Sequence, residues 1–482
     1  MNIIAVSPKN LRKSIAVGAV LHSDRQPVAA ARLRTSSRTI AAFAATAATL
    51  ALAACGNTYR PVVSSINPVG PAGQPTKYAV AISTTGPTTK GLVTLIDFSG
   101  DTVVNTTLIG VNPKYFQLAA NGFEGYTINS DGTLNSFSIS SSLLASEVLQ
   151  STLYPNSNPV SLYSSGTNTY IAEAGRNSVA QLSGLPPAIQ QELPTGANTI
   201  YTVGANQSPR AYAISQGSTP GGNGTVVPIE AASNTIDSPI PVGVKPVYGV
   251  MTADSRRAFI LNSGSNNVTV INAQTNALDT YNLPNPIPVG VSPIWADFSP
   301  GKNELLVANA GDGVTPGSVT VISIPLCSVS VVTSNPLCNV TNPVDAVGFG
   351  QIVATIPVGV NPIMIAVMQD GTEAFVANAG NPNLPCVLPT AGNAPNCSVS
   401  VINLETNTVI ATIPAITSTN QSDAYVHGRP NFIGVTTGTP TGKAYITAGD
   451  STDISIIRSD INTIQTHLPL QGLGVSVRMN TP

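Results

Sequence analysis

Charged, aromatic and histidine side chains are all scarce in this chain. Charged residues make up 9% of its 482 residues, whereas they reach about 25% in an average soluble protein. The three histidines, His22, His427 and His467, lie far apart in the sequence, so a histidine-rich copper or zinc site is not expected. The motif Cys-x-x-Cys-His is absent, which excludes haem attached through that motif.

The motif Gly-x-Ser-x-Gly is absent as well, which argues against the nucleophile elbow of α/β-hydrolases. No cofactor and no metal site are therefore expected. Calcium stays open as an alternative, because Asn and Asp recur in the expected turns, although turns also use these residues for their own geometry. The residues concerned are Asn309, Asp312, Asn378 and Asn381.

An uncharged run near the N-terminus is too short to cross a membrane. Ile40–Ala54 holds 15 residues, and a transmembrane helix needs about 20. The run follows three arginines and ends in Leu-Ala-Ala-Cys at Cys55, which resembles the lipobox of bacterial lipoproteins. The resemblance implies a signal peptide over 1–54, acylation of Cys55 and a flexible tether over 55–75. Gly56 in place of Asp implies the outer membrane; an ordinary secretory signal is the alternative.

Cleavage before Cys55 changes the charge of the chain. Residues 1–54 hold seven of its 21 basic and one of its 23 acidic side chains, which leaves 14 basic and 22 acidic residues and a net charge of −8. A surface of this sign does not attract a polyanion, which excludes nucleic acid as the expected partner.

The four other cysteines form two pairs with the same Cys-x10-Cys spacing. Cys327 and Cys338 lie in one Pro-, Asn- and Ser-rich insertion, and Cys386 and Cys397 lie in another. Disulfides persist in exported proteins, so the bridges Cys327–Cys338 and Cys386–Cys397 are predicted. A four-cysteine zinc site is the alternative, but its ligands usually have Cys-x2-4-Cys spacing.

A seven-residue phrase, Ile-Pro-Val-Gly-Val-x-Pro, occurs three times. It begins at Ile240, Ile287 and Ile356, and each copy is followed by three short apolar runs separated by turn residues. Four such runs per unit indicate four antiparallel strands, and a period of about forty residues is typical of a propeller blade. The sequence therefore predicts an all-β protein, with a single β-propeller of four-stranded blades over residues 76–482.

Weaker copies of the second run set the number of blades. They begin at Lys77, Glu124, Asn168, Arg210 and Lys443, which favours eight blades and leaves seven open. A last apolar run, Leu-Gly-Val-Ser-Val-Arg-Met, is expected to be an inner strand that pairs with the first blade. Pairing of the two chain ends would close the ring and leave no long sheet edge.

Two segments resemble the unit of YVTN-type β-propeller repeat proteins. They are VMQDGTEAFVANAG (367–380) and SVSVINLETNTVIATIP (398–414), and the resemblance extends over about 60–478. It implies a propeller fold and a surface or periplasmic location in the bacterial envelope. It implies no single activity, although some relatives are described as lactonase-like.

Charged residues are expected on one face of the propeller, around the mouth of its central channel. They lie in turns between the second and third strands or in outer-to-inner connections; the candidates for ligand binding are Arg176, Lys245, Asp312, His427, Arg429 and Asp450. Asp297 alternates within an inner strand and is expected to line the channel.

No catalytic residue is identified, because one channel carboxylate does not make an active site. The expected function is non-catalytic binding of a protein, a glycan or another envelope ligand through the mouth loops. The alternative is a lactonase-like hydrolase that acts at the channel.

Overall fold

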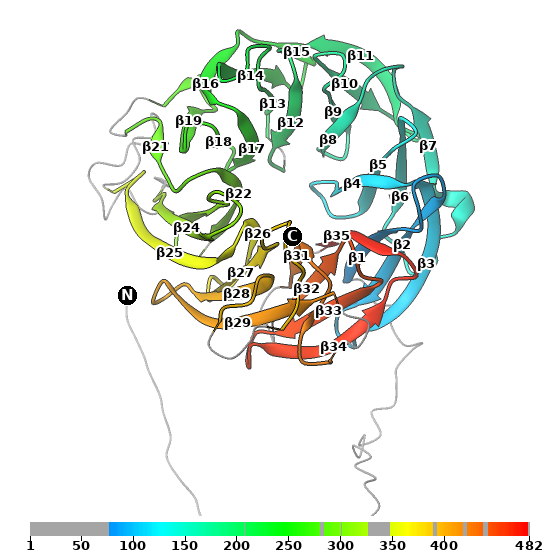
Figure 1. Ribbon diagram of the computed structural model, residues 1–482. Helices are drawn as coiled ribbons and strands as arrows, with labels where there is room; N and C mark the ends of the chain where they lie inside the picture. The colour runs from blue at the N-terminus through cyan, green and yellow to red at the C-terminus, as the bar shows by residue number, and fades with distance from the viewer. Residues whose placement is uncertain are drawn as a thin grey trace, which may run out of the picture. The chain divides into compact units, whose positions relative to one another are not determined.

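The computed structural model describes residues 77–206, 208–279, 284–299, 301–325, 348–388, 393–417, 422–436 and 442–480. Within these ranges the chain forms eight sheets in a ring around a common centre, with antiparallel strand pairing except for one short parallel pair (Figure 1). This confirms the predicted all-β propeller with eight blades and excludes seven. The blades are numbered 1 to 8 along the chain, starting with the sheet that contains β1.

Each blade has four strand positions from the centre outwards. The inner strands of blades 1 to 8 are β35 (Leu473–Met479), β4 (Pro113–Leu118), β8 (Pro159–Ser164), β12 (Thr199–Gly204), β17 (Pro246–Met251), β22 (Pro293–Ser299), β26 (Pro362–Val367) and β31 (Pro430–Val435). The second strands are β1 (Tyr78–Thr84), β5 (Glu124–Asn129), β9 (Asn168–Glu173), β13 (Arg210–Ser215), β18 (Arg257–Asn262), β23 (Glu304–Asn309), β27 (Glu373–Asn378) and β32 (Lys443–Ala448).

The third and outer strands complete the blades. The third strands are β2 (Lys90–Asp97), β6 (Thr133–Ser138), β10 (Ser178–Ser183), β14 (Asn223–Glu230), β19 (Asn267–Asn272), β24 (Pro316–Ser323), β28 (Ser398–Asn403) and β33 (Asp453–Arg458). The outer strands are β3 (Thr102–Val111), β7 (Leu149–Thr152), β11 (Ala188–Pro194), β15 (Thr235–Ile236) with β16 (Ile240–Val244), β20 (Ala277–Leu278) with β21 (Ile287–Pro288), β25 (Ile352–Val360), β29 (Thr408–Ile416) with β30 (Val426–His427), and β34 (Thr463–Pro469). A short 3-10 helix, η1, covers Ala145–Glu147.

The two ends of the propeller meet in blade 1. The last strand, β35, pairs antiparallel with the first, β1, so that Ala79 faces Met479 and Ile82 faces Ser476. The backbone N–H of Tyr78 also donates to the side chain of Asn480 (2.7 Å). The predicted closure by pairing of the two ends is confirmed.

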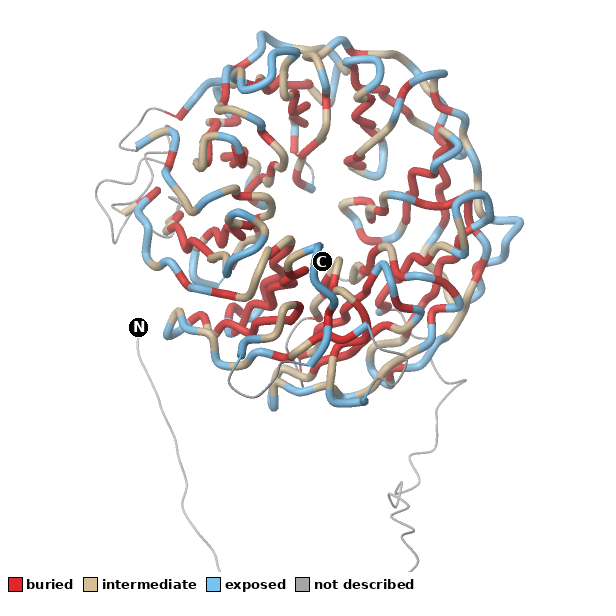
Figure 2. The backbone as a smooth tube through the Cα atoms, viewed as in Figure 1, coloured by how far each residue is buried: buried red, intermediate tan, exposed pale blue. Residues whose placement is uncertain are grey.

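The core lies between the blades, at the second and third strands. All six residues of β27 are buried, whereas the outer strand β34 alternates between exposed and half-buried positions. Figure 2 shows this as buried backbone within the ring and exposed backbone around its outside. Second strands have neighbouring blades on both faces, which explains their nearly continuous apolar runs.

The repeated phrase Gly-Val-x-Pro is the connection from one blade to the next. Its third residue has a left-handed backbone, with φ of +50° at Lys245, +56° at Ser292 and +52° at Asn361. Its glycine is required by close packing, because a Cβ on Gly359 would lie 2.7 Å from the side chain of Asn378. That Asn378 amide donates to two serine hydroxyls of β28. The phrase therefore recurs because these three blade junctions use the same turn and the same glycine–asparagine contact.

One of the two predicted disulfides is confirmed. Cys386 and Cys397 are bonded, with their Cα atoms 5.2 Å apart, and they close the loop between β27 and β28. The predicted Cys327–Cys338 bridge lies outside the described residues, as do Cys55, the signal peptide and the tether up to residue 75. Within the described ranges, no helix is long and apolar enough to span a membrane.

Candidate functional site

The predicted mouth residues lie on one face of the ring but on different blades. We call this face, which carries the turns between second and third strands, the mouth face. Arg176 lies in such a turn of blade 3 and forms two hydrogen bonds of 2.7 Å with the carboxylate of Glu192. Lys245 is exposed in the connection between blades 4 and 5. Asp312 lies in blade 6, where hydrogen bonds from the backbone of Thr315 and Val314 lower the pKa of its carboxyl.

His427, Arg429 and Asp450 do come together, at the junction of blades 7 and 8. The backbone N–H of Arg429 donates to Asp450 Oδ1 (2.7 Å). The Arg429 guanidinium donates to the carbonyls of Ala379 and Leu384, the latter at 2.8 Å, in the part of the β27–β28 loop that precedes Cys386. Arg429 therefore fastens this loop to the blade junction, and its charge does not point freely into solvent.

The centre of the ring is occupied by a layer of aromatic side chains. Tyr248 stacks on Trp295 with ring centroids 4.3 Å apart, and Tyr201 lies 4.8 Å from Tyr248. Trp295 of blade 6 also meets Phe432 of blade 8 edge to face at 5.6 Å. Because blade 7 lies between blades 6 and 8, this contact is possible only if both side chains reach the centre of the ring. These residues and Tyr115 of blade 2 form what we call the aromatic layer.

The aromatic layer has a simple structural cause. Each of its residues stands two positions after the residue that opens the inner strand, and the strand pairing shifts register at the intervening residue. Such a β-bulge re-aims the next side chain, here towards the centre. The pairs are Pro113 and Tyr115, Thr199 and Tyr201, Pro246 and Tyr248, Pro293 and Trp295, and Pro430 and Phe432.

Polar groups lie next to the aromatic layer, and Asp297 is one of them. Its two oxygens accept the backbone N–H groups of Phe298 (2.9 Å) and of Val367 (2.8 Å) on the next inner strand. Burial raises the pKa of Asp297 to about 6, while these hydrogen bonds and the charge of Arg478 oppose the rise. The carboxylate keeps some accessible surface although protein surrounds it, as expected for a residue in the channel.

Arg478 stands at the corresponding level of β35. Its Nε donates to the Phe116 carbonyl (3.0 Å), and its guanidinium lies 4.8 Å from the centroid of the Phe432 ring. A cavity of about 140 Å³ opens beside it, towards the ends of β12 and β17 and thus towards the face opposite the mouth. Among the residues that line this cavity are Gln117, Tyr163, Tyr201, Tyr248, Val250 and Arg478.

The tyrosine hydroxyls of the aromatic layer stay protonated at neutral pH. Burial raises the pKa values of Tyr115, Tyr201 and Tyr248 above their usual range. The Tyr115 hydroxyl lies near that of Tyr201, yet it is buried and makes no hydrogen bond of normal geometry within the described residues. The channel can therefore offer aromatic faces together with neutral and cationic hydrogen-bond donors.

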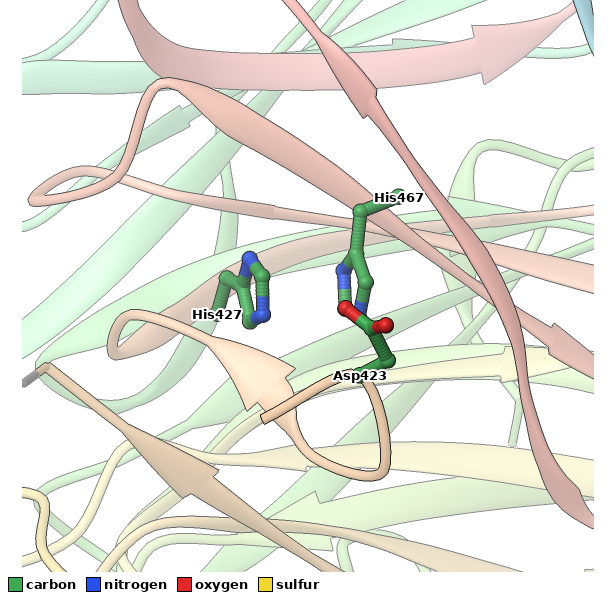
Figure 3. A group of neighbouring side chains, drawn as sticks. All are labelled: Asp423, His427 and His467. Atoms are coloured by element: carbon green, nitrogen blue, oxygen red, sulfur yellow. The ribbon is translucent and has the colours of Figure 1, made fainter. Parts of the chain in front are cut away.

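A second group of side chains lies at the outer part of the junction between blades 7 and 8. The imidazole rings of His427 and His467, which the sequence separates by forty positions, stack with centroids 3.5 Å apart (Figure 3). The ligand atoms of Asp423 and of both histidines lie within 4.8 Å of one another. Burial lowers the pKa of His467, and the charge of His427 lowers it further. In the part of the chain that the structure describes, this is the one group of three or more His, Cys, Asp or Glu residues that could hold a metal ion.

Sequence reasoning missed both the aromatic layer and the proximity of the two histidines. The signal for the layer was present, because four of the strand-opening prolines are followed two residues later by Tyr, Trp or Phe. No repeat signal pointed to the histidines, because His427 lies in the connection into blade 8 and His467 lies in the outer strand of that blade.

No known family profile matches the chain, and no curated protein matches its sequence. Solved structures do match its fold. Dihydro-heme d1 dehydrogenase NirN, in complex with DHE, is 11% identical, with 84% of this chain and 75% of that chain covered and a TM-score of 0.58. Apo AztD from Citrobacter koseri is 11% identical, with 84% and 97% covered and a TM-score of 0.54. At such identities the likeness shows the propeller fold alone.

Proposed function

We propose that this chain is an exported, lipid-anchored β-propeller of the bacterial envelope that binds a saccharide unit of an envelope glycan in its central channel without catalysis. The observation that carries the proposal is the aromatic layer, with Gln117 and Arg478 beside it. Ligand sites in proteins are typically recessed, lined by aromatic side chains and supplied with a few polar groups.

The chemistry of the channel suits a sugar ring. The C–H face of a pyranose is apolar and packs on an aromatic ring, while its hydroxyl groups need donors and acceptors at the edge. Tyr248 offers the ring, and Gln117 and Arg478 offer polar groups on the same cavity wall. The cavity of about 140 Å³ is smaller than the roughly 300–1,000 Å³ of sites for drug-sized ligands, which favours one sugar unit over a longer segment.

The arrangement of Asp297 favours binding over hydrolysis. Among the residues of the eight inner strands, all of which the structure describes, Asp297 is the one carboxylate. Both of its oxygens accept backbone N–H groups, which gives this carboxylate a structural role between two inner strands. A lactonase-like mechanism would need a second acid or base that converges on the same point.

The envelope location rests on sequence features. The Leu-Ala-Ala-Cys junction at Cys55 supports an anchored, exported protein. The resemblance to YVTN-type repeats supports the same location. The Cys386–Cys397 bridge agrees with an oxidising compartment.

Trp295 provides a direct test, because it is the single tryptophan of the chain and belongs to the aromatic layer. We expect saturable changes in its fluorescence when the protein is titrated with glucose, galactose, N-acetylglucosamine and glucuronic acid and their disaccharides. Tyr248→Ala should weaken the affinity for the bound sugar at least about tenfold, or 1.4 kcal/mol. Tyr154→Ala, which removes an aromatic ring from a depression on the mouth face, is the matched control.

Two results would argue against the proposal. One is the absence of saturable binding for every sugar in the panel; the other is loss of binding in Tyr154→Ala but not in Tyr248→Ala. Turnover of a sugar lactone that disappears in Asp297→Asn would favour the hydrolase instead.

A further inference from the structure

The histidine pair at the junction of blades 7 and 8 carries an inference separate from the channel. His427 belongs to β30, which pairs with the outer strand of blade 7, and His467 belongs to the outer strand of blade 8. Asp423 lies in the turn that precedes β30. We propose that His427, His467 and Asp423 bind a divalent transition-metal ion, with Zn²⁺ as the ion that fits best.

The two imidazoles present unused ring nitrogens. Nε2 of His427 and Nε2 of His467 are both buried, and neither makes a hydrogen bond of normal geometry in the described structure, although a contact with the Asp423 backbone opposes the larger effect of burial, which lowers the pKa of His467. Buried polar atoms in proteins nearly always have a partner, which is often an ion or water when no protein group serves. Two such atoms on stacked rings point to a shared ligand between the blades.

The other ring nitrogens are held in the way that metal-binding histidines are held. Nδ1 of His427 lies 2.9 Å from Asp453 Oδ2, and because an ionised carboxylate can only accept, this nitrogen carries the proton. The lone pair of His427 is then on Nε2. Nδ1 of His467 lies 3.1 Å from the hydroxyl of Ser455, which also accepts the backbone N–H of His427. A carboxylate behind a metal-binding imidazole is a recurrent second-sphere arrangement.

Asp423 supplies the third ligand. Its side chain is exposed, whereas His427 is 7% exposed, so an ion would enter from the aspartate side (Figure 3). The three ligand atoms lie within 4.8 Å of one another, and bonds of about 2.0–2.1 Å in a tetrahedral site would bring them to about 3.4 Å. The rings are parallel to within 4°, so one must rotate for both lone pairs to meet at the ion.

The donor set selects the class of ion. Two imidazole nitrogens and one carboxylate oxygen suit Zn²⁺ and related first-row ions, whereas Ca²⁺ and Mg²⁺ prefer oxygen ligands alone. Three protein ligands leave the fourth position of a tetrahedral ion for water or for an exchanging ligand. The site is thus suited to an ion that can be delivered and removed.

The test is calorimetric titration of ZnCl₂ into the full chain after removal of metal with a chelator and alkylation of free thiols. We expect one Zn²⁺ per chain, and no saturable heat with CaCl₂. His467→Ala should abolish measurable binding at this site. Asp423→Asn should weaken binding at least about tenfold, and Asp453→Asn, which acts through His427, by roughly 10- to 100-fold. Asp460→Asn, an exposed carboxylate of the same blade, should leave binding unchanged.

A second readout avoids dependence on variants that fold poorly. Co²⁺ bound by the unmodified chain should give the intense visible absorption of a four-coordinate site, and Zn²⁺ should displace it. Because Asp423 is exposed, the metal-free Asp423→Asn variant should unfold at the same temperature as the metal-free unmodified chain. A loss of Zn²⁺ affinity in this variant then does not come from poor folding. The proposal is overturned if the full chain binds no Zn²⁺ saturably, or if His467→Ala and Asp423→Asn bind it as tightly as the unmodified chain.

Discussion

Tyr445 of blade 8 donates a hydrogen bond from its hydroxyl to the carboxylate of Asp101 in blade 1. The same carboxylate accepts from Lys443 Nζ (2.6 Å) and from Gln465 Nε2 (2.9 Å), both in blade 8. Elsewhere in the ring the equivalent tyrosine meets an asparagine, as Tyr212 does with Asn276 (2.9 Å). At the junction between the last and first blades, the tyrosine hydroxyl therefore donates to a charged carboxylate, whereas at the junction of blades 4 and 5 it donates to a neutral amide.

This difference predicts unequal effects of removing a tyrosine hydroxyl. Tyr445→Phe should lower the free energy of unfolding by about 1.5–3 kcal/mol, because its acceptor is charged, and Tyr212→Phe by about 1 kcal/mol. Unfolding in guanidinium chloride, followed by fluorescence, measures both. Equal losses in the two variants would contradict a special role of the Asp101 junction.

The ion pair between Arg257 and Asp279 is buried, with side-chain exposures of 1% and 2%. Arg257→Met should lower the free energy of unfolding by about 3–5 kcal/mol, because it leaves the Asp279 charge buried without its counter-ion. The double variant Arg257→Leu/Asp279→Leu should lose less than the single one. Denaturant unfolding at low and high salt checks this, and a strong salt dependence in the unmodified chain would indicate a solvated pair instead.

Asp297 predicts a pH dependence of stability. Its pKa is about 6 in the folded chain and 3.8 in the reference state, so the folded state favours the protonated carboxyl. The contribution of this group is fully present below about pH 4 and is lost as the pH rises through 6. Asp297→Asn should therefore gain stability relative to the unmodified chain between pH 4 and pH 7.5. The gain should stay below the roughly 3 kcal/mol of two pKa units, because the group is partly accessible.

The measurement is the difference in unfolding free energy between Asp297→Asn and the unmodified chain at each pH. Taking the difference removes the contributions of other carboxyls. A constant difference across this range would show that Asp297 has an ordinary pKa.

The Cys386–Cys397 bridge closes part of the loop between β27 and β28, and Arg429 holds the part of that loop that precedes Cys386. Replacing both cysteines by serine should lower the free energy of unfolding by roughly 2–3 kcal/mol, as expected for a loop of about twelve residues. Thermal unfolding with and without reductant measures this. If reductant destabilises the double variant as much as the unmodified chain, the effect comes from another bridge.

Much of the fold could be predicted because the strand signal is local. The alternating runs, the forty-residue period and the terminal run after Leu470 were sufficient for the propeller, its blade number and its closure. The phrase Gly-Val-x-Pro marked the blade junctions correctly. Its physical cause, the contact of Gly359 with Asn378, joins residues of two different strands and needed the structure.

The sites were harder to predict because they depend on what adjacent blades place together. Arg176 was a candidate for ligand binding, but its guanidinium donates two hydrogen bonds to the carboxylate of Glu192. Trp295 was not among the predicted site residues, because nothing in a single blade shows that its side chain reaches Phe432 two blades away. His427 and His467 were treated as unrelated, since the prediction considered only their distance along the chain, whereas both contact Ser455 of β33 in the folded blade.

The pairing of β1 with β35 also affects the order in which the propeller can form. A chain is made from its N-terminus, so the inner edge of β1 stays unpaired until Leu473–Met479, the last strand of the ring, has been made. Until then the first blade exposes strand groups that could pair with another chain. Removal of residues 473–482 would delete β35, so that the inner edge of β1 would stay unpaired and could pair with a strand of another chain.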